Sequence, residues 1–456
     1  MSDLTQMAPP AEMLEKTSGV QLRMALACIV VAVLGGAVGA LHYVPSLSPV
    51  LNDIGLTFPK LRPIHTAFAS LWIFGGSIAI VYHFLCSHHG GLTAGDLLRF
   101  RIHTVCWLVA GVGILGSLFL GYSTGREYLG FPVVFSVILL VGWVAFAWNL
   151  LRRLRHGFWG QPIYLWFWTV GSLFFMYTFV EGHAYLLDSV FESPIKDLQV
   201  QWKSCGTLVG SFNFMMYGSL TYVGERLSGD KKYGQSPIAF WLFGVGCLNS
   251  FTNYVHHTYH LPQTDVVKWV AFIVSMAEII VLVKLMLDMA KILKNKQGDA
   301  PFCGRGGWLA MAKWWTIFML FTSIVISVPT FNTLIHGTQL VMGHAMGATV
   351  GIDTLVLLGT ASWLVVELRG SAVLPRIDAP MTKKMIWLIS GSLAVMVIWL
   401  SVAGYVHGTS RYNGEATPHW VSGSRWLLPV VGSMLGAGLL VTTLRLLSMS
   451  RSQARA

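Results

Sequence analysis

The stretch His336-Gly337-Thr338-Gln339-Leu340-Val341-Met342-Gly343-His344-Ala345-Met346-Gly347 opens a long apolar segment of this chain. It places a histidine and a methionine two residues apart. Residues i and i+2 of an α-helix point about 200° apart, because the helix has 3.6 residues per turn. One helix can therefore present His344 and Met346 to two neighbouring sites. Core packing would explain such a pair in a soluble helix, but ionisable residues inside a membrane are by default functional candidates.

Apolar segments of this kind recur along the whole chain. The composition is 54% hydrophobic and only 11% charged, and runs of about 20 apolar residues can cross a bilayer as helices. We predict an all-α polytopic membrane protein with twelve transmembrane helices. The predicted spans are residues 24–46, 63–86, 103–123, 131–151, 162–186, 201–224, 237–258, 266–290, 312–332, 338–367, 384–407 and 427–447.

The spans are predicted to form a single membrane domain over residues 21–450. Residues 1–20 and 451–456 are expected to be short cytoplasmic tails, and residues 1–20 lack the features of a cleavable signal peptide. Most of the 31 Lys and Arg residues fall in the loops on the side of the termini. By the positive-inside rule this predicts a multi-pass protein of the bacterial cytoplasmic (inner) membrane with both termini cytoplasmic. The basic charge thus implies a lipid bilayer and no nucleic acid as partner.

Four predicted helices carry polar side chains at the same depth, in the outer half of the membrane. These are His65, the adjacent pair His256-His257, Glu278 and His344. Neutral imidazole is the commonest metal ligand and the usual axial ligand of haem. A carboxylate favours iron over copper as the metal, or it relays protons. For His256-His257 a polar helix end that faces water stays open as an alternative.

The predicted outer loop Gly125-Arg126-Glu127-Tyr128 contains an Arg-Glu pair. Such a pair is either a solvated salt bridge of small energetic value or part of a site for haem propionates or a divalent cation. Carboxylate oxygens suit calcium. The six cysteines form no C-x-x-C-H motif, so covalently attached haem is not expected in this chain.

Three motifs together resemble the catalytic subunit of the haem–copper oxidase superfamily. They are Leu61-Arg62-Pro63-Ile64-His65-Thr66, Gly125-Arg126-Glu127-Tyr128, and His336-Gly337-Thr338-Gln339-Leu340 followed by His344. Within the superfamily the chain is most similar to the bacterial nitric oxide reductase large subunit, with features of the C-family (cbb-type) oxidase. The resemblance covers residues 60–370 and implies the haem–copper oxidase subunit I fold.

The resemblance implies a role for each of these side chains. His65 would bind a low-spin haem b, and His344 a high-spin haem b. His256 and His257 would bind a second metal beside the high-spin haem: non-haem iron, or copper. Glu278, in Ser275-Met276-Ala277-Glu278, falls where the reductases carry a glutamate next to that iron. In the outer loop, Glu127 would bind a calcium ion that bridges haem propionates.

The chain also departs from the family pattern. Met346 stands where these families have the second histidine of the low-spin haem, so a His65/Met346 haem is expected. The histidine that binds the second metal from the sixth helix falls on Gly206 or Cys205, and a second reductase glutamate falls near Gly210. The cross-linked tyrosine of the oxidases falls near Ser250, which speaks against ordinary four-electron oxygen reduction.

Three ways of completing the second-metal site stay open. Cys205 supplies a thiolate; or His256, His257, Glu278 and water complete it; or no second metal binds. We favour the second, with Glu181 and His183 as further candidates nearby. Toward the inner half, Lys284, Asp288 and Asp353 are candidates for a proton path, although an ordinary i,i+4 ion pair between Lys284 and Asp288 is preferred.

The resemblance implies an oxidoreductase of denitrification that reduces NO to N2O. Electrons would come through the low-spin haem from a membrane-anchored c-type cytochrome subunit or a soluble periplasmic cytochrome c. Alternatives are an NO dismutase-like or other small-gas reductase, and a non-catalytic haem subunit that passes electrons within a larger membrane complex. A transporter with an intramembrane His/Glu proton relay is a further alternative.

Overall fold

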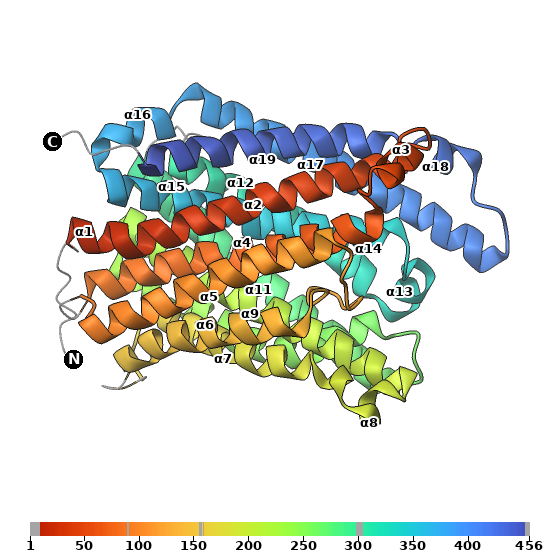
Figure 1. Cartoon of the computed structure of the whole chain (residues 1–456), viewed down its shortest axis with the longest axis horizontal. Helices are drawn as coiled ribbons and strands as arrows, with labels where there is room; N and C mark the ends of the chain where they lie inside the picture. The colour runs from red at the N-terminus through yellow and green to blue at the C-terminus, as the bar shows by residue number, and fades with distance from the viewer. Residues whose placement is uncertain (1–9, 89–90, 155–156, 158, 298–303, 452–456) are drawn as a thin grey trace.

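The computed structural model describes residues 10–88, 91–154, 157, 159–297 and 304–451 as a bundle of helices (Figure 1). No strand occurs among these residues. The α-helices are α1 (Ala11–Leu14), α2 (Val20–Ala40), α3 (Ser48–Asp53), α4 (Phe58–Ser87), α5 (Ala94–Phe119), α6 (Val133–Leu151), α7 (Ile163–Glu181), α8 (Asp188–Phe191), α9 (Pro194–Ser228), α10 (Pro237–Thr252), α11 (Asp265–Gln297), α12 (Gly304–Ser327), α13 (Pro329–Ile335), α14 (Gln339–Ala348), α15 (Leu355–Arg369), α16 (Leu374–Ile377), α17 (Pro380–Asn413), α18 (His419–Gly423) and α19 (Leu427–Arg451).

Eleven segments of the described chain are long and apolar enough to cross a membrane. α9, which has 35 residues and is more polar, runs among them and packs against α4, α7 and α10. With α9, the described residues supply the twelve long helices that the sequence predicts. The predicted all-α polytopic membrane fold is therefore confirmed.

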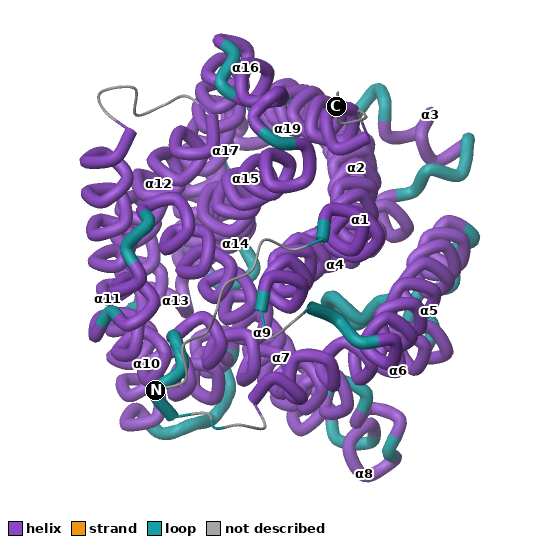
Figure 2. Tube along the Cα trace, turned by 90° about the vertical axis from the view of Figure 1, so that its left-hand side faces the viewer, coloured by secondary structure: helices purple, strands orange, loops and turns teal. Residues whose placement is uncertain are grey.

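Three helices form the centre of the bundle. α4, α9 and α15 contact one another, and α2, α5, α6, α7, α10, α11, α12, α17 and α19 lie around them (Figure 2). α4 and the continuous segment Gln339–Arg369 are the most deeply buried of the apolar spans. The stretch that begins at His336 thus leads into a central helix. Polar residues inside a membrane normally face the interior of the bundle, so this position suits a polar site.

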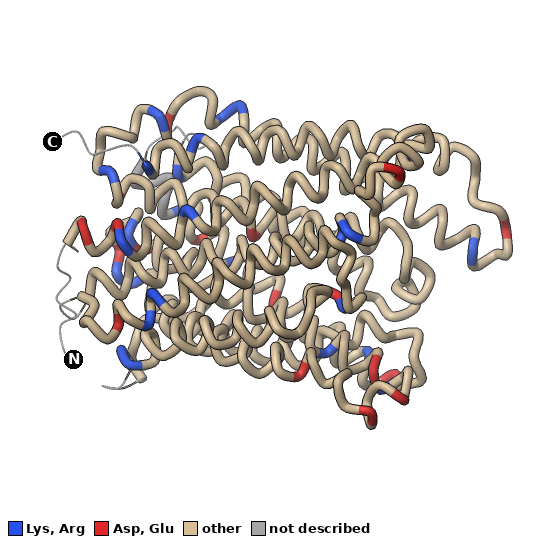
Figure 3. The backbone as a smooth tube through the Cα atoms, in the orientation of Figure 1, with Lys and Arg blue, Asp and Glu red and all other residues tan. Residues whose placement is uncertain are grey.

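Both ends of the described chain lie at the same end of the bundle (Figure 1). We call it the inner end, and the opposite end the outer end. Lys and Arg residues gather toward the inner end (Figure 3). An even number of spans brings the termini together, and the basic bias agrees with the loop pattern of the sequence.

Residues 11–20 differ from the predicted tail, because they continue α2 toward the inner end as α1 and the π-helix η1 (Glu15–Gly19). Thr17 and Ser18 are fully buried there. The Ser18 hydroxyl donates to the carbonyl oxygen of Ala79 on α4 at 2.6 Å, so this small polar side chain keeps a partner when it leaves water. The rest of the predicted tail, residues 1–9, and residues 452–456 lie outside the described residues.

The central helix that follows His336 is irregular in its middle. α14 passes into the π-helix η7 (Thr349–Thr354), which α15 continues. η7 carries the buried Asp353. Single π-turns inside α-helices are frequent at functional sites, because they turn side chains out of the regular register. α14 begins after Gly337, whose positive φ of 74° favours glycine.

Candidate functional site

Two adjacent histidines lie side by side in the outer half of the bundle. α10 ends at Thr252 and tightens into the 3₁₀ segment η6 (Asn253–His257), which carries His256 and His257. Their ring centroids are 4.2 Å apart, and His344 on α14 lies in the same region of the bundle. The change from α-helix to 3₁₀-helix directs the consecutive side chains of His256 and His257 toward the same region. The predicted binding of one metal by both histidines requires this arrangement.

Trp202 of α9 holds the ring of His257 from one side. The two rings are stacked, with centroids 4.5 Å apart and an angle of 2° between their planes. Such a stack limits rotation of the imidazole. Trp202 belongs to the predicted sixth span, but nothing in the sequence indicates that it contacts a histidine.

The ring nitrogens of these residues suit ligation. Nδ1 of His256 and Nδ1 of His344 are buried and have no hydrogen-bond partner among the described residues. On α4, Nδ1 of His65 is hydrogen-bonded to the carbonyl oxygen of Ala32 at 2.8 Å. A ligating histidine characteristically donates its other N–H to a carbonyl, which fixes the ring and its tautomer. His65 therefore has Nε2 available for a metal.

Some residues next to His65 and His344 are not fully covered by the bundle. Ala345, between His344 and Met346 on the central α14, is exposed, and Met346 is half-buried. Ala69 and Ser70, one turn beyond His65 on α4, are also half-buried although α4 is central. The residues present are compatible with haem groups at His65 and His344, because each helix offers an imidazole and, next to it, partly exposed residues.

Glu278 lies in a polar pocket of its own. Its carboxylate accepts hydrogen bonds from the Asn249 amide at 2.5 Å and from the Tyr217 hydroxyl at 3.3 Å. Ser275 donates to Asn249 at 2.8 Å. The side chain is buried. Asn249 thus connects Ser275 to Glu278 by hydrogen bonds, and Tyr217 donates a further hydrogen bond to Glu278. The sequence analysis singles out neither Asn249 nor Tyr217.

The structure places His256 beside His257, with His344 in the same region. Among the described residues, no three His, Cys, Asp or Glu side chains are grouped as a metal site. The assignment of Glu278 to the second metal therefore stays a prediction.

The two glycines of α9 at the missing family positions face α10 and η6. A Cβ at Gly206 would lie 2.2 Å from Oδ1 of Asn253, and a Cβ at Gly210 would lie 2.2 Å from Oγ of Ser250. A side chain at either position would require Asn253 or Ser250 to move, so the helices pack closely at both glycines. The neighbouring Cys205 points elsewhere: its Sγ lies 3.8 Å from the carbonyl oxygen of Glu127.

The loop with Arg126 and Glu127 connects three elements. Arg126 donates to Asp197 of α9 at 2.7 Å, and Glu127 accepts from Arg62 of α4 at 2.5 Å. The two residues thus pair with other helices and not with each other. Tyr128 has a φ of 59°, the only positive φ of a non-glycine residue in the described chain, and such strain persists where surrounding contacts hold it.

Two further candidates have protein partners. Both ring nitrogens of His183 are hydrogen-bonded, Nδ1 to the carbonyl oxygen of Phe179 at 2.6 Å and Nε2 to the Ser136 hydroxyl at 2.8 Å. Glu181 forms an ion pair with Lys203. Both ring nitrogens of His183 are therefore satisfied, whereas Oε2 of Glu181 is buried without a hydrogen-bond partner among the described residues. A ligand role for either residue stays a prediction.

Two histidines outside the predicted set lie near the His256-His257 pair. His336 and His260 have ring centroids 4.4 Å apart, and His336 interacts electrostatically with His256 and His257. Burial, with His260 and Arg411 close by, lowers the pKa of His336 below its usual value. The signal was present in the sequence, since His336 begins the stretch that contains His344, and His260 follows His257 by three residues.

The comparisons with known proteins agree on one family. The family described as "Cytochrome C and Quinol oxidase polypeptide I" matches residues 19–438. The chain is similar to a nitric oxide reductase subunit of Stutzerimonas stutzeri, with 22% identity over 415 residues that cover 84% of this chain and 82% of that protein. A heme-copper terminal oxidase dimer solved by cryo-electron microscopy shares the fold, with a TM-score of 0.75 and 13% identity over 97% of this chain and 85% of that one.

Proposed function

This chain belongs to the cytochrome c and quinol oxidase polypeptide I family, and we propose that it is the catalytic subunit of a divergent nitric oxide reductase. Family membership supports a redox-active subunit that sits in a membrane. The finer assignment, reduction of NO to N2O, rests on the residues of the outer half. In the overall reaction, two molecules of NO, two electrons and two protons give N2O and water.

In this proposal the histidines divide between three centres. His65 with Met346 holds a low-spin haem b, and His344 holds a high-spin haem b. His256 and His257, with Glu278 and water, hold the second metal, for which a carboxylate favours iron. Bound there, the haems carry electrons and the metal pair binds the substrate, which is chemistry that no side chain of this chain supplies alone.

The main support for the proposal is the His256-His257 pair, whose ring centroids are 4.2 Å apart. In addition, Nδ1 of His256 and Nδ1 of His344 are buried without a protein partner among the described residues. Buried polar atoms are normally paired, so these two unpaired imidazole nitrogens are consistent with a role of both histidines in ligation. Ser250 supports NO over oxygen as the substrate, because it stands where the oxidases have their tyrosine and its Oγ packs against Gly210.

We also propose that Glu278, with Tyr217, takes part in proton delivery. The reaction consumes protons, and the carboxylate of Glu278, which accepts hydrogen bonds from a phenol and an amide, can bind and release a proton. Glu127, held by Arg62 at the outer loop, is proposed to lie beside the haem propionates, where a calcium ion would complete its coordination.

The site's depth supports a periplasmic source of electrons. The histidines lie in the outer half, and the basic residues gather at the inner end (Figure 3), which by the positive-inside rule faces the cytoplasm of a bacterial inner membrane. We propose a c-type cytochrome, as a membrane-anchored subunit or a soluble periplasmic protein, as the electron donor.

The test is NO consumption by the purified complex with a chemical reductant, together with its iron and copper content. A rate above that of free haem, with about three iron atoms per chain for the two haems and the metal of the donor set, supports the proposal. A complex that consumes no NO above the haem background contradicts it. Gas chromatography of N2O separates reduction from a dismutase-like or other small-gas reaction, which would release a different product.

One observation favours a second candidate, a non-catalytic haem subunit that passes electrons within a larger complex. Gly206 is closed off by Asn253, so α9 offers no ligand from the position that supplies one in the oxidases. Metal analysis separates the two functions. An iron content that equals the haem content, with no copper, supports the electron-transfer subunit and contradicts a binuclear enzyme.

A further inference from the structure

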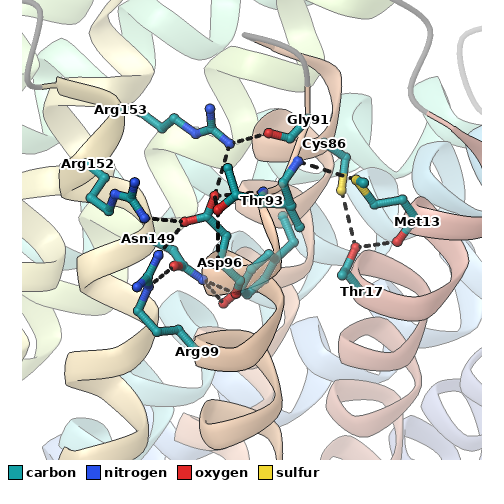
Figure 4. A network of polar contacts seen from close by, with 12 residues as sticks. Met13, Thr17, Cys86, Gly91, Thr93, Asp96, Arg99, Asn149, Arg152 and Arg153 are labelled. Carbon is teal, nitrogen blue, oxygen red and sulfur yellow. Dashed lines mark hydrogen bonds and ion pairs between the residues drawn. The ribbon is translucent and has the colours of Figure 1, made fainter.

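A cluster of arginines surrounds one carboxylate at the inner end, away from the histidines (Figure 4). Asp96, on the first turn of α5, is buried. Arg99 donates to its Oδ1 at 2.6 Å, and Arg152 donates to the same atom at 3.2 Å. Arg153 lies 3.7 Å from Oδ2. We call these four residues the Asp96 cluster.

The carboxylate of Asp96 has no capacity left for a further cation. Its Oδ2 also accepts from the backbone N–H and the hydroxyl of Thr93, at 2.9 and 2.7 Å, in a capping box that starts α5. Since Arg99 and Arg152 share one negative charge, these two guanidinium groups alone leave a surplus of one positive charge. The acidic residues of the N-terminal helix do not reduce it, because Glu12 pairs with Lys16 and Glu15 with Arg23 and Arg369.

The surplus is accessible on one side. The side chain of Arg152 is 41% exposed and that of Arg99 is 23% exposed. Asn149 fixes Arg99, since its amide oxygen accepts from Nε at 2.6 Å. Among the described residues Arg152 uses Nη1 on Asp96, and a guanidinium has five N–H donors in a planar fork that matches a phosphate group.

An apolar surface leads directly to Arg152. Val137, Val141, Val144 and Trp148 follow one another at helical spacing on α6, and all are exposed. Arg152 comes one turn after Trp148 and continues the same stripe. α5 packs beside α6 and both lie at the periphery of the bundle (Figure 2), so this stripe faces the acyl chains of the bilayer.

We propose that the Asp96 cluster binds the headgroup of an anionic glycerophospholipid from the inner leaflet, with its acyl chains along the α6 stripe. The charge surplus selects a headgroup with net negative charge over a zwitterionic one, because a zwitterion leaves the surplus charge uncompensated. The apolar stripe selects a lipid over free phosphate. Basic pockets between transmembrane helices at the inner side bind anionic headgroups by the same physics.

The test uses the full complex, purified in detergent and stripped of lipid. Phosphatidylglycerol or phosphatidylcholine with identical acyl chains is added, and bound lipid is counted by native mass spectrometry while the melting temperature is recorded. We expect phosphatidylglycerol to be retained and to raise the melting temperature by several degrees, and phosphatidylcholine to do neither. Arg152→Gln is expected to weaken retention about fivefold, the effect of one basic residue at a membrane surface.

Lys384→Gln is the matched control, since Lys384 is an exposed cation near the start of α17 and lies outside the cluster. It is expected to retain phosphatidylglycerol like the unchanged protein. Arg152→Lys keeps the charge without the fork, and should retain an intermediate amount even if the glutamine variant is unstable.

Three outcomes would overturn the proposal: equal retention of both lipids, an equal loss in Lys384→Gln, or full stabilisation by inorganic phosphate alone. The first means ordinary boundary lipid, the second unspecific attraction to the basic end, and the third a phosphate site without acyl selectivity.

Discussion

The outer half and the inner end of this bundle place their polar groups in opposite ways. In the outer half, Nδ1 of His256 and Nδ1 of His344 are buried and have no hydrogen-bond partner among the described residues. At the inner end, carboxylates are enclosed by cations: Asp96 by three arginines, and Glu15 by Arg23 and Arg369, each at 2.8 Å. In the outer half these ring nitrogens have no protein partner in the described part of the chain, whereas at the inner end each of these carboxylates is paired with cations of the chain.

The difference separates function from stability. A buried donor or acceptor without a partner costs free energy, about 1–3 kcal/mol, so the outer half is expected to gain its missing interactions from cofactors. The inner end draws its interactions from ion pairs within the protein. Substitutions in the outer half should therefore change cofactor content and activity, and substitutions at the inner end should change the melting temperature.

The largest effect is expected from His344→Ala. Without the imidazole the high-spin haem has no protein ligand, so its optical and EPR signals and NO consumption should be lost. His407→Gln is the control, because His407 is a half-buried histidine of the outer half whose Nδ1 is hydrogen-bonded to Gln339. An unchanged high-spin signal in the His344→Ala protein would contradict the assignment of His344 as the haem ligand.

Glu278→Gln should act on the second metal and leave both haems in place. The glutamine keeps the size of the side chain and loses the charge, and we expect metal affinity to fall about 10- to 100-fold, as for the loss of groups around a metal. Metal analysis at equal haem content measures the change. Ser275→Ala, which removes only the hydroxyl that donates to Asn249, should have a much smaller effect; equal metal loss in both variants would deny Glu278 a ligand role.

Asp96→Asn tests the inner end. It removes the one carboxylate that three guanidinium groups share, and breaking such a buried ion pair costs about 3 kcal/mol. The melting temperature should fall while the haem spectrum stays unchanged. If the spectrum changes as much as the stability does, the two regions are not independent.

Met346→His should sharpen the assignment of the low-spin haem. Methionine as an axial ligand raises the potential of haem relative to histidine. The substitution is therefore expected to lower the midpoint potential, by a fraction of the ~0.8 V range that axial ligands span. A spectroelectrochemical titration measures it. Met342→Leu, one turn away, is the control, and an unchanged potential in Met346→His would remove Met346 from the ligand set.

The smallest effect is expected from Lys284→Gln. The predicted i,i+4 ion pair with Asp288 is confirmed, and both side chains are exposed. An exposed pair of this kind contributes about 0.3–0.5 kcal/mol, so the melting temperature and the NO consumption should hardly change. A large loss of activity would instead support the alternative that Lys284 and Asp288 belong to a proton path from the inner side.

Much of the fold could be predicted because the membrane limits the choice. Each span must satisfy its backbone hydrogen bonds internally, so an apolar run of sufficient length becomes a helix. The long helices α2, α4, α6, α7 and α10 fall close to the predicted spans, and the stretch from His336 to Gly347 does open a central helix. α9 is recognised less easily, because its charged residues at both ends lower its hydropathy.

The candidate site could be predicted only in part, since residue type and depth can be read from a sequence but orientation cannot. His65, His256, His257 and His344 were recognised as ligand types at one depth. That Glu278 is held by Asn249 and Tyr217, that Arg126 and Glu127 pair with other helices, and that Asn253 fills the place beside Gly206 depend on side-chain directions between helices.

Hydropathy and charge along the chain were enough to predict an all-α polytopic membrane protein whose basic residues gather at one end. Both features follow from local hydrophobicity and from the solvation of charge. Only the tertiary structure decided which of the polar residues face one another, because that depends on the rotation of each helix about its axis. The rotation results from the packing of the whole bundle, so no single span of this chain contains the information.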